Sequence, residues 1–150
     1  MSGPADDGGA TIRIERTFRA PAQAVFEAWT SEEVLRRWWH AEHDWETPFA
    51  EVDLRVGGTI RVTMRNPHEG TDHGGGGEFT VIDPPRRLAF TWRWDEDPST
   101  EQLVELEFTD HGDRTTTVVL TNSGLPPQET ADYEDGWQKS FDNLEVALRS

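Results

Sequence analysis

The chain has 150 residues, the size of one domain, and only 34% of them are hydrophobic, so its core has to come from a few large side chains. Fourteen basic residues stand against 29 acidic ones, and this formal charge of −15 argues against nucleic-acid or anionic-membrane binding, because both need clustered Lys and Arg. The absence of cysteine excludes disulfides, thiolate nucleophiles and cysteine-based metal sites.

The ends of the chain and its hydropathy bear on its location. Residues 1–10 (MSGPADDGGA) are small and acidic, which predicts a disordered tail before a single domain over residues 11–150. They lack the basic and apolar regions of a signal peptide, and no apolar run exceeds three residues. We therefore expect a cytoplasmic protein.

The first part of the domain predicts one strand and two helices. Residues 11–18 alternate between apolar and polar side chains, with Arg16 on the otherwise apolar face. Residues 21–39 then carry apolar side chains at helical spacing and predict two short helices in succession. Thr30 and Glu33 have the spacing of a capping box at the start of the second helix.

Strand patterns fill the middle of the chain and predict an antiparallel meander. The expected strands are residues 49–56 and 59–65, joined at Gly57-Gly58, and then residues 77–83, 87–94, 103–108 and 114–122. The segment NPHEGTDHGGGG, residues 66–77, predicts a long glycine-rich loop, which would suit a mobile lid because glycine lowers the cost of rearrangement.

The last element is a long helix over residues 128–148. Tyr133, Trp137, Phe141, Leu144 and Leu148 recur at intervals of four and three residues and form one apolar stripe. Because one face of the sheet needs a cover and no other long apolar stripe is available, we expect an α+β fold, with a curved antiparallel sheet of about seven strands around this helix. Aromatic side chains from both layers would line the space between them.

Four blocks of the sequence resemble a known family: RTFRAPAQAVFEAWTSEEVLRRWW, VDLRVGG, PPRRLAFTW and GWQKSFDNLEVAL. They are similar to the activator of heat-shock-protein-90 ATPase homologue-like family, within the START and birch-pollen-allergen-like (SRPBCC) superfamily of helix-grip folds. The resemblance covers nearly all of residues 11–148 in the family's order. It implies a hydrophobic cavity between the sheet and the last helix, with its entrance near the short helices and strand loops.

By position, Trp38 and Trp39 resemble the family's paired tryptophans, and Gly136-Trp137 its helix dipeptide. Members often have Gly-Pro after the paired tryptophans, whereas this chain has His40-Ala41. Because this departure falls at the expected entrance, the identity of the ligand does not transfer from relatives.

The superfamily contains carriers, cyclases and protein-interaction domains, so three hypotheses follow. The first is binding or sequestration of a small hydrophobic molecule of aromatic or polyketide type, with antibiotic self-resistance as a specific form. The second is an enzyme of the cyclase or aromatase type. The third is a co-chaperone-like domain with a protein partner. The sequence leaves open whether the protein is an enzyme, and it indicates no cofactor.

Large aromatic side chains are the main site candidates, because indole and phenol groups pair apolar surface with a polar tip. The predicted ligand-binding residues are Trp38, Trp39, His40, Phe49, Met64, Phe79, Phe90, Trp92, Trp94, Tyr133, Trp137 and Phe141.

The ionisable candidates carry weaker signals. A catalytic base would come from His40, His73, Asp53 or Glu51, each of which fits a surface position equally well. His40 and His43 are three residues apart but follow the end of a helix, where spacing fixes no geometry, so we predict no metal site.

Overall fold

The structure, a computed structural model, describes residues 9–149. Its elements are β1 (Ala10–Phe18), α2 (Ala22–Thr30), α3 (Glu32–Trp38), β2 (Glu46–Val52), β3 (Thr59–Asn66), β4 (Thr71–Asp83), β5 (Arg87–Trp94), β6 (Asp97–Asp110), β7 (Thr116–Leu125), the 3₁₀ turn η1 (Pro127–Glu129) and α4 (Thr130–Arg149). Of the predicted tail, residues 1–8 lie outside the described residues, and Ala10 already belongs to β1.

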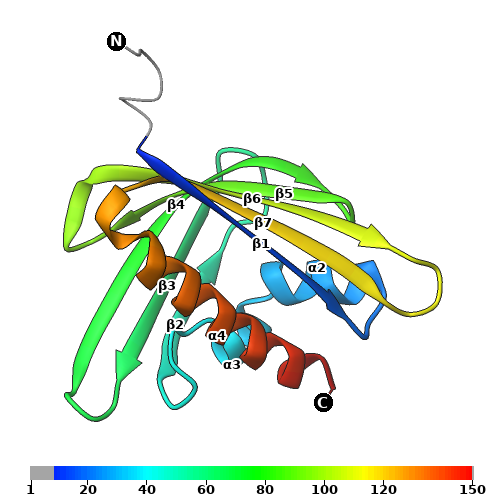
Figure 1. Ribbon diagram of the computed structural model, residues 1–150, viewed down its shortest axis with the longest axis horizontal. Coiled ribbons are helices and arrows are strands. Elements are labelled where there is room, and N and C mark those ends of the chain that lie inside the picture. The colour runs from blue at the N-terminus through cyan, green and yellow to red at the C-terminus, as the bar shows by residue number, and fades with distance from the viewer. Residues whose placement is uncertain (1–8, 150) are drawn as a thin grey trace.

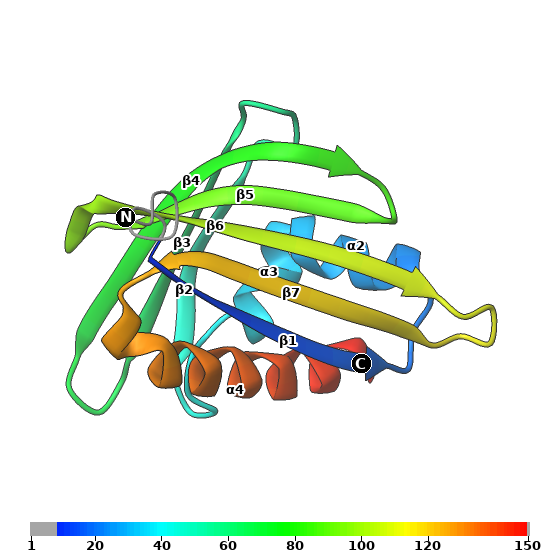
Figure 2. The same ribbon diagram turned by 45° about the horizontal axis from the view of Figure 1, so that its top comes forward.

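One antiparallel sheet of seven strands, in the order β1-β7-β6-β5-β4-β3-β2, forms the frame. The predicted meander from β2 to β7 is present, and β1 pairs with β7, so the first strand lies beside the last. The sheet curls around α4, which runs along its concave side, while α2 and α3 lie at one end (Figures 1 and 2). This is the helix-grip arrangement that the sequence predicts.

The boundary between the two short helices differs from the predicted capping box. Ser31, not Thr30, caps α3, because the Val34 N–H donates to its hydroxyl oxygen at 3.3 Å. Thr30 instead ends α2, and its hydroxyl donates back to the Phe26 carbonyl at 3.1 Å. The predicted capping box of Thr30 and Glu33 is therefore wrong, because the cap of α3 lies one residue later, at Ser31.

The predicted glycine-rich loop over residues 66–77 is also wrong, because most of it is strand. Gly74–Gly77 pair in register with residues 60–63 of β3, and only a short turn separates β3 from β4. A Cβ atom on Gly75 would lie 2.7 Å from the Trp92 ring, so the neighbouring side chain fills the space that a larger residue would need. These glycines therefore allow close packing in a sheet. Because the segment is mostly strand and not a loop, the interpretation as a mobile lid is wrong as well.

Strand β6 is longer than its predicted core over residues 103–108. It begins at Asp97, directly after a tight turn from β5, and its pairing with β5 changes register between Trp92 and Trp94. This early half of β6 sets Gln102 opposite Trp92. The register thus brings a polar side chain onto the concave face beside two indoles.

The concave side of the sheet is filled unevenly. At the end covered by α2 and α3, Trp29 and Trp38 are fully buried and meet edge to face at 4.6 Å. Phe141 and Leu144 of α4 are also fully buried. Nearer the start of α4, Trp137 is only partly buried, and the space in front of this part of the helix is the candidate site.

Candidate ligand-binding cavity

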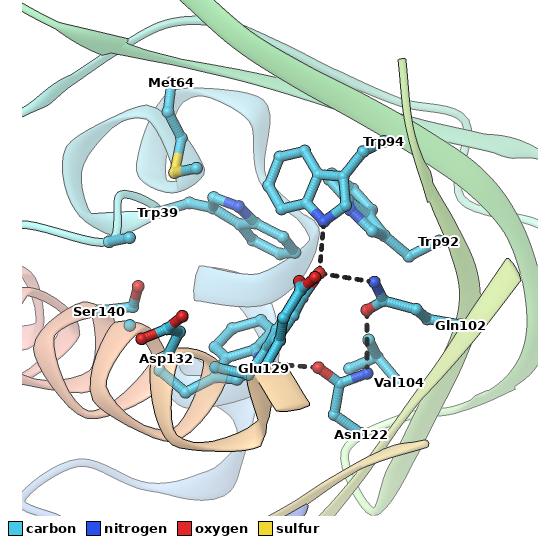
Figure 3. Close-up of a pocket in the computed structure, with 14 residues that line it drawn as sticks. Trp39, Met64, Trp92, Trp94, Gln102, Val104, Asn122, Glu129, Asp132 and Ser140 are labelled. Carbon is cyan, nitrogen blue, oxygen red and sulfur yellow. Dashed lines mark hydrogen bonds between the residues drawn. The ribbon is translucent and has the colours of Figure 1, made fainter. Parts of the chain in front are cut away.

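A cavity of about 270 Å³ lies between the first turns of α4 and the concave face of the sheet (Figure 3). This volume is just below the range of 300–1,000 Å³ that holds drug-sized ligands, so the cavity suits a compact one. Its wall consists of Trp39, Ala41, Met64, Trp92, Trp94, Gln102, Val104, Asn122, Glu129, Asp132, Tyr133, Gly136, Trp137 and Ser140.

Periodicity explains how these residues meet. On α4, Tyr133, Gly136, Trp137 and Ser140 are spaced three, four and seven residues from the first, which places them on one helix face. On the sheet, Trp92 and Trp94 are alternate residues of β5 and share its concave face. The two patterns therefore supply opposite walls.

Indole rings form most of the apolar surface. Trp39 is central, because its ring centroid lies 5.3 Å from those of both Trp92 and Trp137. Trp92 in turn contacts Trp94 edge to face at 5.3 Å. These rings hold one another in place and give the cavity rigid, flat walls that match an aromatic or other planar ligand.

A chain of hydrogen bonds crosses the polar side of the cavity (Figure 3). Trp137 Nε1 donates to Asn122 Oδ1 at 3.0 Å, and Asn122 Nδ2 donates to Gln102 Oε1 at 3.3 Å. Gln102 Nε2 and Trp94 Nε1 both donate to Tyr133 Oη, at 2.8 and 3.0 Å. The chain links α4 with β5, β6 and β7.

The indoles at the two ends fix the direction of every bond, because an indole N–H can only donate. The Asn122 atom that faces Trp137 must be oxygen, so its nitrogen faces Gln102. Gln102 then presents oxygen to Asn122 and nitrogen to Tyr133. Since Trp94 also donates to Tyr133, that hydroxyl accepts twice and keeps its own hydrogen.

Two donors on the wall consequently have no acceptor among residues 9–149. They are the hydroxyl hydrogen of Tyr133 and the second amide hydrogen of Gln102, a residue that is only 3% exposed. Buried donors normally find acceptors, because an unpaired one loses its hydration without compensation. The polar corner can therefore donate two hydrogen bonds to a ligand.

An outer chamber of about 450 Å³, here called the vestibule, adjoins the cavity. The two share Met64, Trp94 and Tyr133 among other residues, and the vestibule adds Glu96, Asp97 and several others. Hydrogen bonds from Thr100 and Ser99 lower the pKa of Asp97, because they favour its charged carboxylate. The approach to the cavity is thus acidic.

Among the predicted ligand-binding residues, the structure brings six together on the cavity wall: Trp39, Met64, Trp92, Trp94, Tyr133 and Trp137. It places four others in the core behind that wall: Trp38, Phe79, Phe90 and Phe141, each at most 1% exposed. Phe49 lies on edge strand β2, is 45% exposed and does not line the cavity.

His40 is buried and does not line the cavity. The Thr47 hydroxyl donates its only hydrogen to the Trp39 carbonyl, so His40 Nδ1 must be the donor in its 2.9 Å bond to Thr47. The Ser140 hydroxyl donates to the His40 carbonyl at 2.9 Å. Burial, with a smaller contribution from His43, lowers the pKa of His40. Through its backbone carbonyl, His40 anchors the loop after α3 to α4.

The other ionisable candidates lie outside the cavity. Asp53 pairs with Arg55 at 2.8 Å, Glu51 is exposed on β2, and His73 lines only the vestibule, where it faces Glu96 at 3.2 Å. Within residues 9–149, no three His, Asp or Glu side chains cluster in a way that could hold a metal ion.

Arg16, the polar residue on the inner face of β1, is also held elsewhere. Its guanidinium donates to Asp142 and to the Gln138 side chain, each at 2.7 Å, and lies over the Phe141 ring. It fastens β1 to the later turns of α4 and takes no part in the cavity wall.

Sequence reasoning missed the polar members of the wall. Gln102 and Asn122 continue the inward phase of their strands, two residues from Val104 and Leu120. A polar residue in an otherwise apolar register was the signal available for both. Glu129 and Asp132 carry no comparable signal, because acidic residues are common in the first turn of a helix.

Comparison with known proteins agrees with the earlier resemblance. The model of the family described as activator of Hsp90 ATPase homolog 1-like protein matches residues 19–149. The chain belongs to this family. The family is part of the SRPBCC superfamily, and its fold supports a ligand-binding domain in general. No curated protein matches the chain significantly.

Solved structures of bacterial relatives share this fold. A protein from Chromobacterium violaceum is 23% identical with a TM-score of 0.84, over 94% of this chain and 99% of its own. The AHSA1 protein from Silicibacter pomeroyi is 27% identical with a TM-score of 0.81, over 93% and 98%. An AHSA1-like protein from Aeromonas hydrophila is 28% identical with a TM-score of 0.78, over 93% and 92%. Within residues 9–149, no helix is both long and apolar enough to cross a membrane.

Proposed function

We propose that this protein binds and holds a small, mainly apolar, planar molecule in the cavity, as a carrier or a sequestering protein. The observation that carries the proposal is the cavity itself, an indole-walled space with one polar corner whose internal hydrogen bonds are already made. Such a site recognises shape and one or two polar groups. Antibiotic self-resistance by sequestration is the specific form that the family resemblance suggests.

Binding without turnover fits the cavity better than cyclisation does. Of the four residues proposed as bases from the sequence, none lines the cavity, and only His73 reaches the vestibule. The ionisable side chains of the cavity wall are Glu129, Asp132 and Tyr133, and within residues 9–149 neither carboxylate is hydrogen-bonded to a nucleophile. A cyclase of this type remains an outcome that the experiment below distinguishes.

The test begins with native mass spectrometry of the purified protein, followed by organic extraction. A co-purified small molecule, recovered unchanged after incubation, is the expected result and would supply the ligand's chemical class. Conversion of that molecule would replace the carrier by an enzyme. Co-purification with a chaperone and no small-molecule binding would replace it by a protein-interaction domain.

Titration with planar aromatic compounds, measured by calorimetry, then locates the site. Replacing Trp92 or Trp137 with Leu should weaken binding at least tenfold, because each indole supplies a large share of the apolar wall. Phe49→Leu, at a predicted residue outside the cavity, is the matched control and should leave affinity unchanged. Unchanged affinity in both tryptophan variants would refute this location.

A further inference from the structure

The polar corner of the cavity presents two unpaired hydrogen-bond donors. Tyr133 keeps its hydroxyl hydrogen and Gln102 its second amide hydrogen, and the two groups are 2.8 Å apart. The side-chain oxygens of Gln102 and Asn122 already accept N–H groups. A carbonyl oxygen with two lone pairs can take both donors.

The exposed carboxylates of the cavity wall have the opposite character. Glu129 and Asp132 line the cavity, and neither side chain has an ion pair or hydrogen bond within the described residues. Glu96 and Asp97 continue the acidic lining in the vestibule, where His73 faces Glu96, and among residues 9–149 no Lys or Arg lines either space. A ligand with an anionic group is repelled on this path, and one with a basic group is attracted.

Together these features specify a ligand class, and this step rests on the proposed function. We infer that the cavity selects a planar, mainly apolar molecule with a carbonyl oxygen at the polar corner and a basic amine beside Glu129 and Asp132. The carbonyl completes the corner at Tyr133 and Gln102, the rings lie among the indoles, and the ammonium group faces Glu129 and Asp132. Carboxylates and phosphates are selected against.

Three related probes separate these requirements: 2-(aminomethyl)anthraquinone, anthraquinone-2-carboxylate and 2-(aminomethyl)anthracene. Calorimetric titration at pH 7 and low salt should rank the first probe tightest. We expect it to exceed the carboxylate by roughly tenfold, a margin that shrinks at high salt because mobile ions screen partly exposed charges. It should exceed the anthracene, which lacks the carbonyl, by roughly three- to tenfold.

Two variants show which residues cause these differences in affinity between the probes. Glu129→Gln with Asp132→Asn should abolish most of the preference for the amine over the carboxylate. The matched control, Glu27→Gln with Glu134→Gln, removes the same charge from exposed positions outside both chambers and should retain the preference. Tyr133→Phe should abolish the preference for the quinone over the anthracene, and the ratio of the two probes cancels any general loss of stability.

The outcomes separate this inference from the function on which it rests. If no probe binds, both fail. If the probes bind but the carboxylate equals or exceeds the amine, the inference about charge is refuted while the binding function stands. If the quinone and the anthracene bind equally well to the unmodified protein, the inference about the polar corner is refuted even should Tyr133→Phe fail to fold.

Discussion

Gly136 offers a direct test of whether a residue is kept for the cavity or for the fold. It is an interior residue of α4, where glycine costs about 1 kcal/mol relative to alanine. A Cβ atom placed on it would lie 3.4 Å from the Cβ of Ala41, an ordinary van der Waals contact, so packing does not require glycine. It also lines the cavity, where an added methyl group reduces the space for a ligand.

Gly136→Ala should therefore stabilise the free protein and weaken its binding. We expect a gain of about 0.5–1 kcal/mol in the free energy of unfolding, with a rise in Tm of about 2–4 °C for a chain of this size. Affinity for 2-(aminomethyl)anthraquinone should fall by roughly three- to tenfold. Urea unfolding with an unchanged m-value measures the first effect and calorimetry the second.

Gly75→Ala provides the contrast. Its Cβ atom would lie 2.7 Å from the Trp92 ring and from the Arg93 carbonyl oxygen, so we expect a loss of stability. If Gly136→Ala destabilised the protein, the contact with Ala41 would be tighter than the structure indicates. If it left affinity unchanged, Gly136 would not bound the ligand, and the reasoning about the cavity wall would be refuted.

Three further predictions concern the parts that hold the cavity in place. Asn122→Leu should lower the free energy of unfolding, measured in urea, by about 2–5 kcal/mol, because it leaves the Trp137 N–H and the Gln102 side-chain oxygen without their partners. A loss below about 1 kcal/mol would contradict the hydrogen-bond network. Burial lowers the pKa of His40 in the folded protein, so below pH 6.5 the unfolded chain takes up a proton that the folded protein does not, and stability falls. The stability advantage over His40→Asn, which does not titrate, should hence shrink from pH 7.5 to pH 5; an advantage that stayed constant or grew would refute this. Gly77→Ala should cost more than about 3 kcal/mol or prevent folding, because its Cβ would lie 1.9 Å from the Thr91 carbonyl oxygen, and a near-native melting temperature would contradict that packing.

The sequence by itself determined the fold class and the supply of aromatic side chains. Alternation along β5 and the three- and four-residue spacing of α4 are local patterns, set by backbone geometry, and both predict which face is apolar. The strand order also follows simply, because each strand from β2 to β7 pairs with the next. Trp92 and Trp137 could be named as candidates on these grounds alone.

Local patterns could not separate core from cavity. Phe90 and Trp92 share a face of β5, yet Phe90 is fully buried in the core while Trp92 bounds the cavity. The two residues differ in their surroundings because α2 and α3 fill one end of the concave side, whereas the other end is left open in front of α4. Which end a residue occupies depends on contacts distant in sequence.

Only the tertiary structure decided the role of the glycines and of the polar corner. Gly74–Gly77 have the composition of a loop, but Trp92, Arg61 and Thr91 occupy the space beside them, and two neighbouring strands supply their backbone partners. Likewise, Gln102 and Asn122 meet because β6 and β7 pair in one register. A hydrogen-bond network across three strands and a helix depends on those registers, which no single segment of the sequence specifies.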